Sequence, residues 1–249
     1  MLEIVFNWLV LPISGNLNHS IDLSTALHGR IMVFAWSFTI PISVFIARFF
    51  KVTPKQGWPH QLDNKFWWHS HRYINYSSVV LTLLGIFLVW KHDQYEGPTR
   101  EFHYLLGWLV VFLCILQLAS TLLRGTKGGP TAPRLNDSGD IIDLFGDHYC
   151  MTNKRVFFER IHKFIGHFSL LLGFIVTTLG LAVADAPRWM WLFLFFWWIG
   201  LAIFFWTLQA KGFCIDTYQA IWGPDPTLPG NRVKPIGVGI HRFDDLRKS

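Results

Sequence analysis

The sequence predicts an all-α integral membrane protein, a helix bundle with about five transmembrane helices. Of its 249 residues, 51% are hydrophobic and 17% aromatic, while only 15% are charged. Soluble domains usually contain about a quarter of charged residues, so this composition is typical of a chain that lies largely in lipid. Five long apolar stretches, separated by segments rich in glycine, proline and charge, predict the same class.

The first segment, residues 1–20, is apolar but is interrupted by Glu3, Asn7 and Pro12. A helix needs about 20 residues to cross the roughly 30 Å of hydrocarbon in a bilayer, so this stretch is too short to span it. It also lacks the positively charged region that opens a secretory signal. We expect an interfacial or partner-contacting segment, with a half-buried hairpin as the alternative.

The membrane domain is predicted to cover residues 21–210. Its five spans are expected at about 27–50, 69–90, 102–123, 158–184 and 189–210. Side chains that favour helix N-termini precede four of these spans: Asp22 or Ser24, Asp63 or Asn64, Thr99, and Thr152. The turn at 185–188 is short, so the last two helices should pack antiparallel.

Two further segments show neither helical nor strand periodicity. The loop 124–157 is predicted to be irregular, and residues 211–249 are predicted to form a cytoplasmic tail. Within the tail, the stretch 216–223 is expected to be ordered. It either docks a partner or packs under the bundle, and we favour packing.

The distribution of basic residues orients the predicted bundle. Eighteen of the 22 Lys and Arg residues fall in 48–72, 124–163 and 211–249, which lie on one side of the membrane if there are five spans. The positive-inside rule places that side in the cytoplasm. We therefore expect a multi-pass membrane protein with the N-terminus outside and the C-terminus in the cytoplasm. Because the charge sorts by membrane side, nucleic-acid binding is disfavoured.

Four of the apolar stretches open with a histidine: His28, His71, His103 and His162. Consecutive membrane helices run in opposite directions, so His28 and His103 should lie at one depth and His71 and His162 at the other. Neutral imidazole is a good axial ligand for heme iron, and a polar side chain inside a membrane helix is usually functional. The pattern predicts a four-helix core with two bis-histidine b-type hemes, which could carry electrons across the bilayer.

Small and cationic residues accompany these histidines. Gly107 and Gly166 follow His103 and His162 by four residues, on the helix face where a porphyrin needs close approach, although glycine is also common in membrane helices. The following cations are expected to contact heme propionates or an anionic electron donor, unless they serve topology alone: Arg30, Arg72, Lys154, Arg155, Arg160 and Lys163. His69 and His148 are candidates for substrate contact or proton transfer.

Two other classes of function stay open at this point. The chain could be an accessory subunit that shapes a larger membrane complex, or a histidine-dependent transporter without heme. Transporters usually show internal repeats and broken helices at mid-depth, and the sequence shows no repeat beyond the histidine-led spans. The electron donor and acceptor are not specified by the sequence.

Several short motifs resemble the cytochrome b561 superfamily of diheme transmembrane proteins, especially its bacterial members and the modules attached to DOMON domains. The resemblance covers about residues 26–184. The motifs that carry it are His28-Gly-Arg-Ile-Met with Trp36 and Pro41, Trp67-Trp-His-Ser-His71-Arg72, His103 with Gly107 and Gln117, and Phe158-Glu-Arg-Ile-His162-Lys-Phe-Ile-Gly166.

This resemblance implies that His28 and His103 bind the heme on the non-cytoplasmic side, and that His71 and His162 bind the cytoplasmic one. It also implies single-electron transfer, with ascorbate, ferric chelates or other one-electron partners at the two ends. The likeness to bacterial members implies the bacterial inner membrane as the location. The chain departs from the pattern by having five spans where many members have six. It also has His69 where members that use ascorbate place a lysine.

Overall fold

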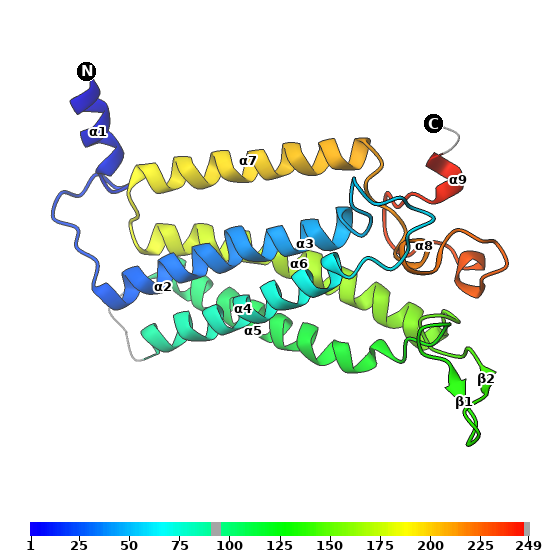
Figure 1. Ribbon diagram of the computed structural model, residues 1–249. Coiled ribbons are helices and arrows are strands. Elements are labelled where there is room, and N and C mark those ends of the chain that lie inside the picture. The colour runs from blue at the N-terminus through cyan, green and yellow to red at the C-terminus, as the bar shows by residue number, and fades with distance from the viewer. Residues whose placement is uncertain (91–95, 247–249) are drawn as a thin grey trace. The chain divides into compact units, whose positions relative to one another are not determined.

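The computed structural model describes residues 1–90 and 96–246, and most of them form helices (Figure 1). Five helices are long and apolar enough to cross a membrane: Leu23–Phe49, Phe66–Val89, Pro98–Arg124, Asn153–Val183 and Arg188–Ala210. The chain is therefore an all-α, multi-pass membrane helix bundle, as the composition predicts.

Each span begins between one and five residues earlier than predicted. The first comprises α2 (Leu23–Val33), a π-helical segment η1 (Phe34–Thr39) and α3 (Ile40–Phe49). The others are α4 (Phe66–Val89), α5 (Pro98–Ser120) with the 3₁₀ turn η2 (Thr121–Arg124), α6 (Asn153–Val183) and α7 (Arg188–Ala210).

Three of the predicted helix starts have the expected side chains. Asp22 accepts a hydrogen bond from the Thr25 amide at 3.0 Å, Asn64 from Phe66 at 2.9 Å, and Thr152 from Arg155 at 3.3 Å. The prediction for Thr99 is wrong. Helix α5 begins at Pro98, because proline has no N–H and suits the first helical position, and the Gly97 carbonyl accepts the amides of Arg100 and Glu101.

The π-helical segment η1 has a chemical cause in Pro41. Proline cannot donate a hydrogen bond to the carbonyl four residues before it, which belongs to Ser37. That carbonyl instead accepts the indole N–H of Trp197, at 2.7 Å. The Trp197 ring also stacks on Phe38, with centroids 4.7 Å apart, so α7 packs against the widened turn.

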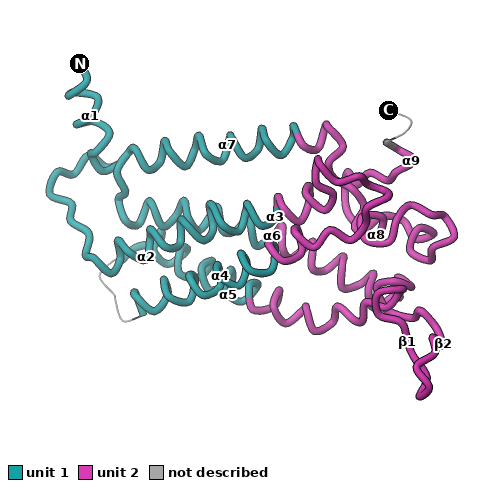
Figure 2. The backbone as a smooth tube through the Cα atoms, in the orientation of Figure 1, with its two compact units in different colours: residues 1–44, 71–114, 168–207 teal, residues 45–70, 115–167, 208–249 magenta. Residues whose placement is uncertain are grey.

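The described residues divide into two compact units (Figure 2). Unit 1 contains residues 1–44, 71–114 and 168–207. Trp36, only 5% exposed, lies at its core and donates its indole N–H to Thr82 on α4 at 3.1 Å. On α6, an added Cβ at Gly173 would come within 2.5 Å of the Trp36 ring, so the glycine makes room for this side chain.

The N-terminal segment of unit 1 starts with helix α1 (Leu2–Val10). All nine residues of α1 are at least partly exposed. The segment after α1 is fastened to the turn between α6 and α7. The amide of Arg188 donates to the Leu11 carbonyl at 3.0 Å, and the Ser14 amide donates to Asp185, also at 3.0 Å.

Unit 2 contains residues 45–70, 115–167 and 208–249, and it includes the loop and the tail that lack periodicity. The loop forms one antiparallel hairpin, β1 (Arg134–Leu135) with β2 (Ile141–Asp143). The tail contains α8 (Thr217–Trp222), a 3₁₀ turn η3 (Pro229–Arg232) and α9 (Phe243–Leu246).

The ordered stretch predicted at 216–223 is helix α8 with its two caps. Asp216 accepts from the Tyr218 amide, and Gly223 ends the helix with φ 93°. Tyr218 is buried in a cluster with Met151 and Ile236, and its hydroxyl donates to the Tyr149 carbonyl at 2.7 Å. This supports packing as the role of α8.

Candidate cofactor site

His28 lies on α2, and its ring is fixed by the neighbouring helix α4. Its Nδ1 is 2.8 Å from the carbonyl oxygen of Gly85. A carbonyl can only accept, so Nδ1 carries the proton and the lone pair of the neutral imidazole is on Nε2. A Cβ added at Gly85 would lie only 2.9 Å from Cε of Met32, so this glycine lets α2 and α4 approach closely.

His103 on α5 is held in the same way by α6. Its Nδ1 is 3.1 Å from the carbonyl oxygen of Val176, which again puts the lone pair on Nε2. Gly180, one helical turn further along α6, lies against the ring. A Cβ placed there would be 3.0 Å from Cε1 of His103.

The structure brings His28 and His103 together inside unit 1. Their ring centroids are 6.2 Å apart, and the ring planes are at 85°. An iron bonded to two imidazole nitrogens at about 2 Å each, with each centroid about 1.1 Å behind its nitrogen, separates the centroids by about 6 Å. The separation of the two side chains is compatible with this distance, so His28 and His103 would be the residues that hold a heme here.

His71 and His162 lie in different units, His71 in unit 1 and His162 in unit 2. On α4, Nδ1 of His71 is 3.0 Å from the hydroxyl of Ser43 and 3.2 Å from its carbonyl oxygen. On α6, Nδ1 of His162 is 3.5 Å from the hydroxyl of Ser120. The pairing of His71 with His162 stays a prediction.

All four histidines thus turn Nδ1 toward an oxygen on another helix. Metal-binding histidines commonly donate one ring N–H to a carbonyl or similar acceptor, which orients the ring and leaves the other nitrogen for the metal. Other histidines differ. His19 uses Nε2 toward the Ala184 carbonyl, and Nδ1 of His167 contacts the carbonyl of Lys163 on its own helix.

The donor set also suits a porphyrin. Within residues 1–90 and 96–246, no group of three or more His, Cys, Asp or Glu side chains is placed to hold a metal ion. A pair of imidazoles completes a metal centre only if other ligands come from elsewhere, and a porphyrin supplies four nitrogens.

The predicted arginines differ in their surroundings. Arg30 is exposed and borders an apolar groove of about 200 Å³ with Phe34 and Trp189. Arg72 is half-buried, with its guanidinium 5.8 Å from the Tyr76 ring centre, and Arg160 is exposed. Contact of these three with a heme propionate stays a prediction.

A buried ion-pair cluster is the feature that sequence reasoning missed. Glu159 on α6 is 7% exposed and lies between two cations, 2.6 Å from the Lys163 ammonium and 3.5 Å from the Arg155 guanidinium. The three residues are spaced four apart, which puts them on one helix face. That spacing is the signal that could have revealed the cluster.

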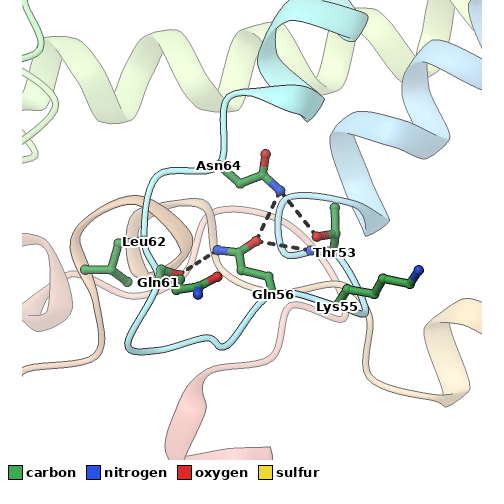
Figure 3. Close-up of a pocket in the computed structure, with 6 residues that line it drawn as sticks. All are labelled: Thr53, Lys55, Gln56, Gln61, Leu62 and Asn64. Atoms are coloured by element: carbon green, nitrogen blue, oxygen red, sulfur yellow. Dashed lines mark hydrogen bonds between the residues drawn. The ribbon is translucent and has the colours of Figure 1, made fainter.

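A polar pocket of about 330 Å³ lies on the connection between α3 and α4 (Figure 3). Its side chains mainly bond to one another. The Gln56 amide oxygen accepts from the Thr53 amide and from Asn64, both at 3.2 Å, and its amide nitrogen donates to the Gln61 carbonyl. The lining contains no histidine or acid, so we assign it no chemical role.

Comparison with known proteins finds similarity to reductases. The chain is 34% identical over 100 residues to putative ferric-chelate reductase 1 of Xenopus laevis, covering 39% of this chain and 16% of that protein. It is 27% identical over 177 residues to a putative ferric-chelate reductase 1 homolog of Drosophila melanogaster, covering 70% and 23%. Ferric-chelate reductase 1 of Homo sapiens is 29% identical over 119 residues, covering 48% and 20%.

The alignments span less than a quarter of the length of these relatives. No family model matches the sequence, and no solved structure matches it. The similarity therefore applies to a part of each reductase.

Proposed function

We propose that this chain transfers single electrons across a membrane through two b-type hemes, each held by two histidines. The observation that carries the proposal is the facing pair His28 and His103, with ring centroids 6.2 Å apart and both Nδ1 atoms bonded to carbonyls. The similarity to proteins named ferric-chelate reductases supports electron transfer as the activity.

His28 and His103 would hold one heme, and His71 and His162 the other. A bound heme would supply one-electron chemistry, because its iron can change oxidation state by one electron. The protein residues position the ligands. The carbonyls of Gly85 and Val176 fix the rings of His28 and His103.

The distribution of basic residues supports one orientation of the chain in the membrane. The basic segments 48–72, 124–163 and 211–249 would face the cytoplasm, which places the His71 and His162 heme on that side and the N-terminus outside. Arg72 and Arg160 would then attract heme propionates or an anionic donor near the inner surface, and Arg30 would do so near the outer one. The divisions at 1–20, 21–210 and 211–249 stay predictions. So does the bacterial inner membrane, because the three relatives are animal proteins.

The test is heme content and spectra of the purified full chain. We expect a b-type reduced-minus-oxidised spectrum and two hemes per chain. His28→Ala and His103→Ala should each remove the same heme, while His71→Ala and His162→Ala should each remove the other. His167→Ala, which changes an exposed histidine bonded to its own helix, should keep both.

Two results would contradict the proposal. A chain purified without any heme would favour an accessory subunit or a transporter. Loss of the same heme in His28→Ala and His71→Ala would show that the pairing is wrong. Electron transfer from an internal reductant to external ferricyanide in proteoliposomes then tests the direction.

A further inference from the structure

His148, in the loop before α6, is buried and has one ring nitrogen without a partner. The residue is only 6% exposed. The indole N–H of Trp222 on α8 points to Nδ1 of His148 at 3.3 Å. An indole can only donate, so Nδ1 holds the lone pair and the ring proton is on Nε2. Among the described residues, Nε2 has no hydrogen-bond partner.

Arg155 presents a second buried donor in the same unit. The residue is 8% exposed, and within the described part of the chain its Nε has no acceptor. Its terminal nitrogen is 3.5 Å from Glu159, but that carboxylate is shared with Lys163 at 2.6 Å. The Glu159 carboxylate is therefore shared between two cations, and Asp147 is a second carboxylate that acts on the Arg155 guanidinium.

The charge of Arg155 acts on His148. Burial lowers the pKa of His148 to about 3, and Arg155 is the nearby charge that contributes most to this shift after burial. The imidazole is therefore neutral at physiological pH and keeps its Nε2 proton. Arg124 and Lys127 also lower the pKa of His148, and Glu159 opposes them.

We propose that the Nε2–H of His148 and the Nε–H of Arg155 together bind a carboxylate group. Leaving two donors buried and unpaired is costly, and a carboxylate can accept both through its two oxygens. Hydrogen bonds between an arginine and a carboxylate are also among the strongest in proteins. The acceptor should be anionic because the charges around His148 are mainly positive.

The position of the site limits where this carboxylate comes from. The Arg155 guanidinium lies 5.1 Å from the Phe158 ring centre, and Phe158 stacks on His162 with centroids 5.3 Å apart and planes at 26°. The site is thus next to one of the proposed heme ligands. The carboxylate is either a propionate of that heme, which rests on the proposed function, or a free carboxylate such as an iron-chelating acid, which does not.

The experiment compares His148→Phe and Arg155→Lys with two controls in the detergent-solubilised full chain. Arg155→Lys keeps the charge beside Glu159 and removes the Nε donor. The controls, His60→Phe and Arg134→Lys, change exposed residues of the same unit. Citrate is the probe for a free carboxylate and is titrated calorimetrically. Redox titration of each heme is the readout for a propionate.

For a free carboxylate, we expect the wild-type chain to bind citrate and both variants to weaken binding about tenfold or more, with the controls unchanged. If the carboxylate is a heme propionate, we expect no citrate binding, and we expect the midpoint potential of one heme to shift in both variants. That shift should be confined to the heme that His162→Ala removes.

The proposal is overturned if citrate does not bind and neither variant shifts a potential, because the two donors then bond only to water. A chain without heme that still binds citrate through both residues refutes the proposed function but not this site. If His148→Phe fails to fold by size-exclusion chromatography, Arg155→Lys alone decides.

Discussion

His103 and Gly180 lie against each other across α5 and α6, so closely that a Cβ on Gly180 would sit 3.0 Å from Cε1 of the imidazole. Few real Cβ atoms approach a neighbour so closely, and the ring is also tied to the Val176 carbonyl one turn away. The ring orientation of His103 therefore depends on the absence of a side chain at position 180.

Gly180→Val is expected to lose the heme of the His28 and His103 pair, and Gly180→Ala to keep it with an altered ligand field. Alanine alone would normally stabilise a helix by up to about 1 kcal/mol relative to glycine, so a loss has to come from the displaced ring. Heme content and low-temperature electron paramagnetic resonance of the oxidised protein measure the effect.

Gly200→Ala on α7 is the matched control, since an added Cβ there meets nothing within 4 Å among the described residues. If Gly180→Val binds two hemes with unchanged spectra, then His103 is not a ligand or its ring can move without cost.

That His28 and His103 lie close together could be predicted from their order in the sequence alone. Each opens an apolar span, and alternate helix directions bring odd-numbered spans to the same depth. What the order could not supply is the ring geometry, because it depends on backbone carbonyls. The Gly85 and Val176 carbonyls are chosen by helix packing, and any residue type can provide a carbonyl.

The helix limits were predictable to within a few residues, and the errors share a cause. Apolar periodicity marks where a helix enters lipid, whereas the hydrogen-bonded helix starts at its cap in the polar layer. Asp22 and Thr152 cap their helices as expected, but Pro98 displaced Thr99 because its missing N–H suits the first turn. The burial of His148 depends on contacts with α8, more than seventy residues away, which local patterns do not encode.

Ser43 offers a test of how His71 is oriented. Its side chain is fully buried, and its hydroxyl lies 3.0 Å from Nδ1 of His71. Hydrogen bonding at Nδ1 makes an imidazole a stronger donor to a metal and favours the higher oxidation state. Ser43→Ala is therefore expected to raise the midpoint potential of the heme that His71→Ala removes, without loss of heme.

The control is Ser77→Ala, at an exposed position on α4, the helix that carries His71. This variant should leave both heme potentials unchanged in the same spectroelectrochemical titration. The result that contradicts the prediction is an unchanged potential in Ser43→Ala. The Ser43 carbonyl, 3.2 Å from Nδ1, would then suffice to hold the ring.

The buried neutral His148 makes stability depend on pH. Burial first, and Arg155 next, lower its pKa from 6.5 to about 3 in the folded chain. Between these values the unfolded chain binds a proton that the folded chain does not, so stability is full above pH 6.5 and falls as the pH drops toward 3. The slope contributed by this residue is at most about 1.4 kcal/mol per pH unit.

Thermal unfolding followed by tryptophan fluorescence between pH 4 and 8 measures this contribution. His148→Phe should flatten the acid side of the profile, whereas His60→Phe, at an exposed position, should keep the wild-type slope. Equal slopes in all three proteins would mean that His148 is protonated in the folded chain.

Asp185 fastens the N-terminal segment to the turn between α6 and α7, and its charge should control that attachment. The Ser14 amide donates to Oδ1 of Asp185 at 3.0 Å, the Ser14 hydroxyl donates to Oδ2, and the His19 ring bonds the adjacent Ala184 carbonyl at 2.9 Å. Burial raises the pKa of Asp185, but the hydrogen bonds from Ser14 outweigh it and hold the pKa below its ordinary value. The carboxylate is therefore charged at neutral pH.

Asp185→Asn isolates this charge. Asp185 has φ 42°, and asparagine tolerates that left-handed backbone, so the turn itself should persist. A hydrogen bond to a charged acceptor contributes about 1.5 kcal/mol or more, so the Ser14 amide should exchange its hydrogen roughly tenfold faster in the variant. Hydrogen–deuterium exchange with peptide-level mass spectrometry over residues 11–19 detects this.

Asp225→Asn is the control, because Asp225 accepts similar bonds from Thr227 in the tail. Exchange at 11–19 should be unchanged in that variant. If Asp185→Asn also exchanges at the wild-type rate, the backbone bonds from Arg188 to Leu11 and from Ile13 to Ala186 hold the segment alone. In that case the carboxylate contributes no measurable protection, and lowering the pH through its pKa should not release residues 11–19 either.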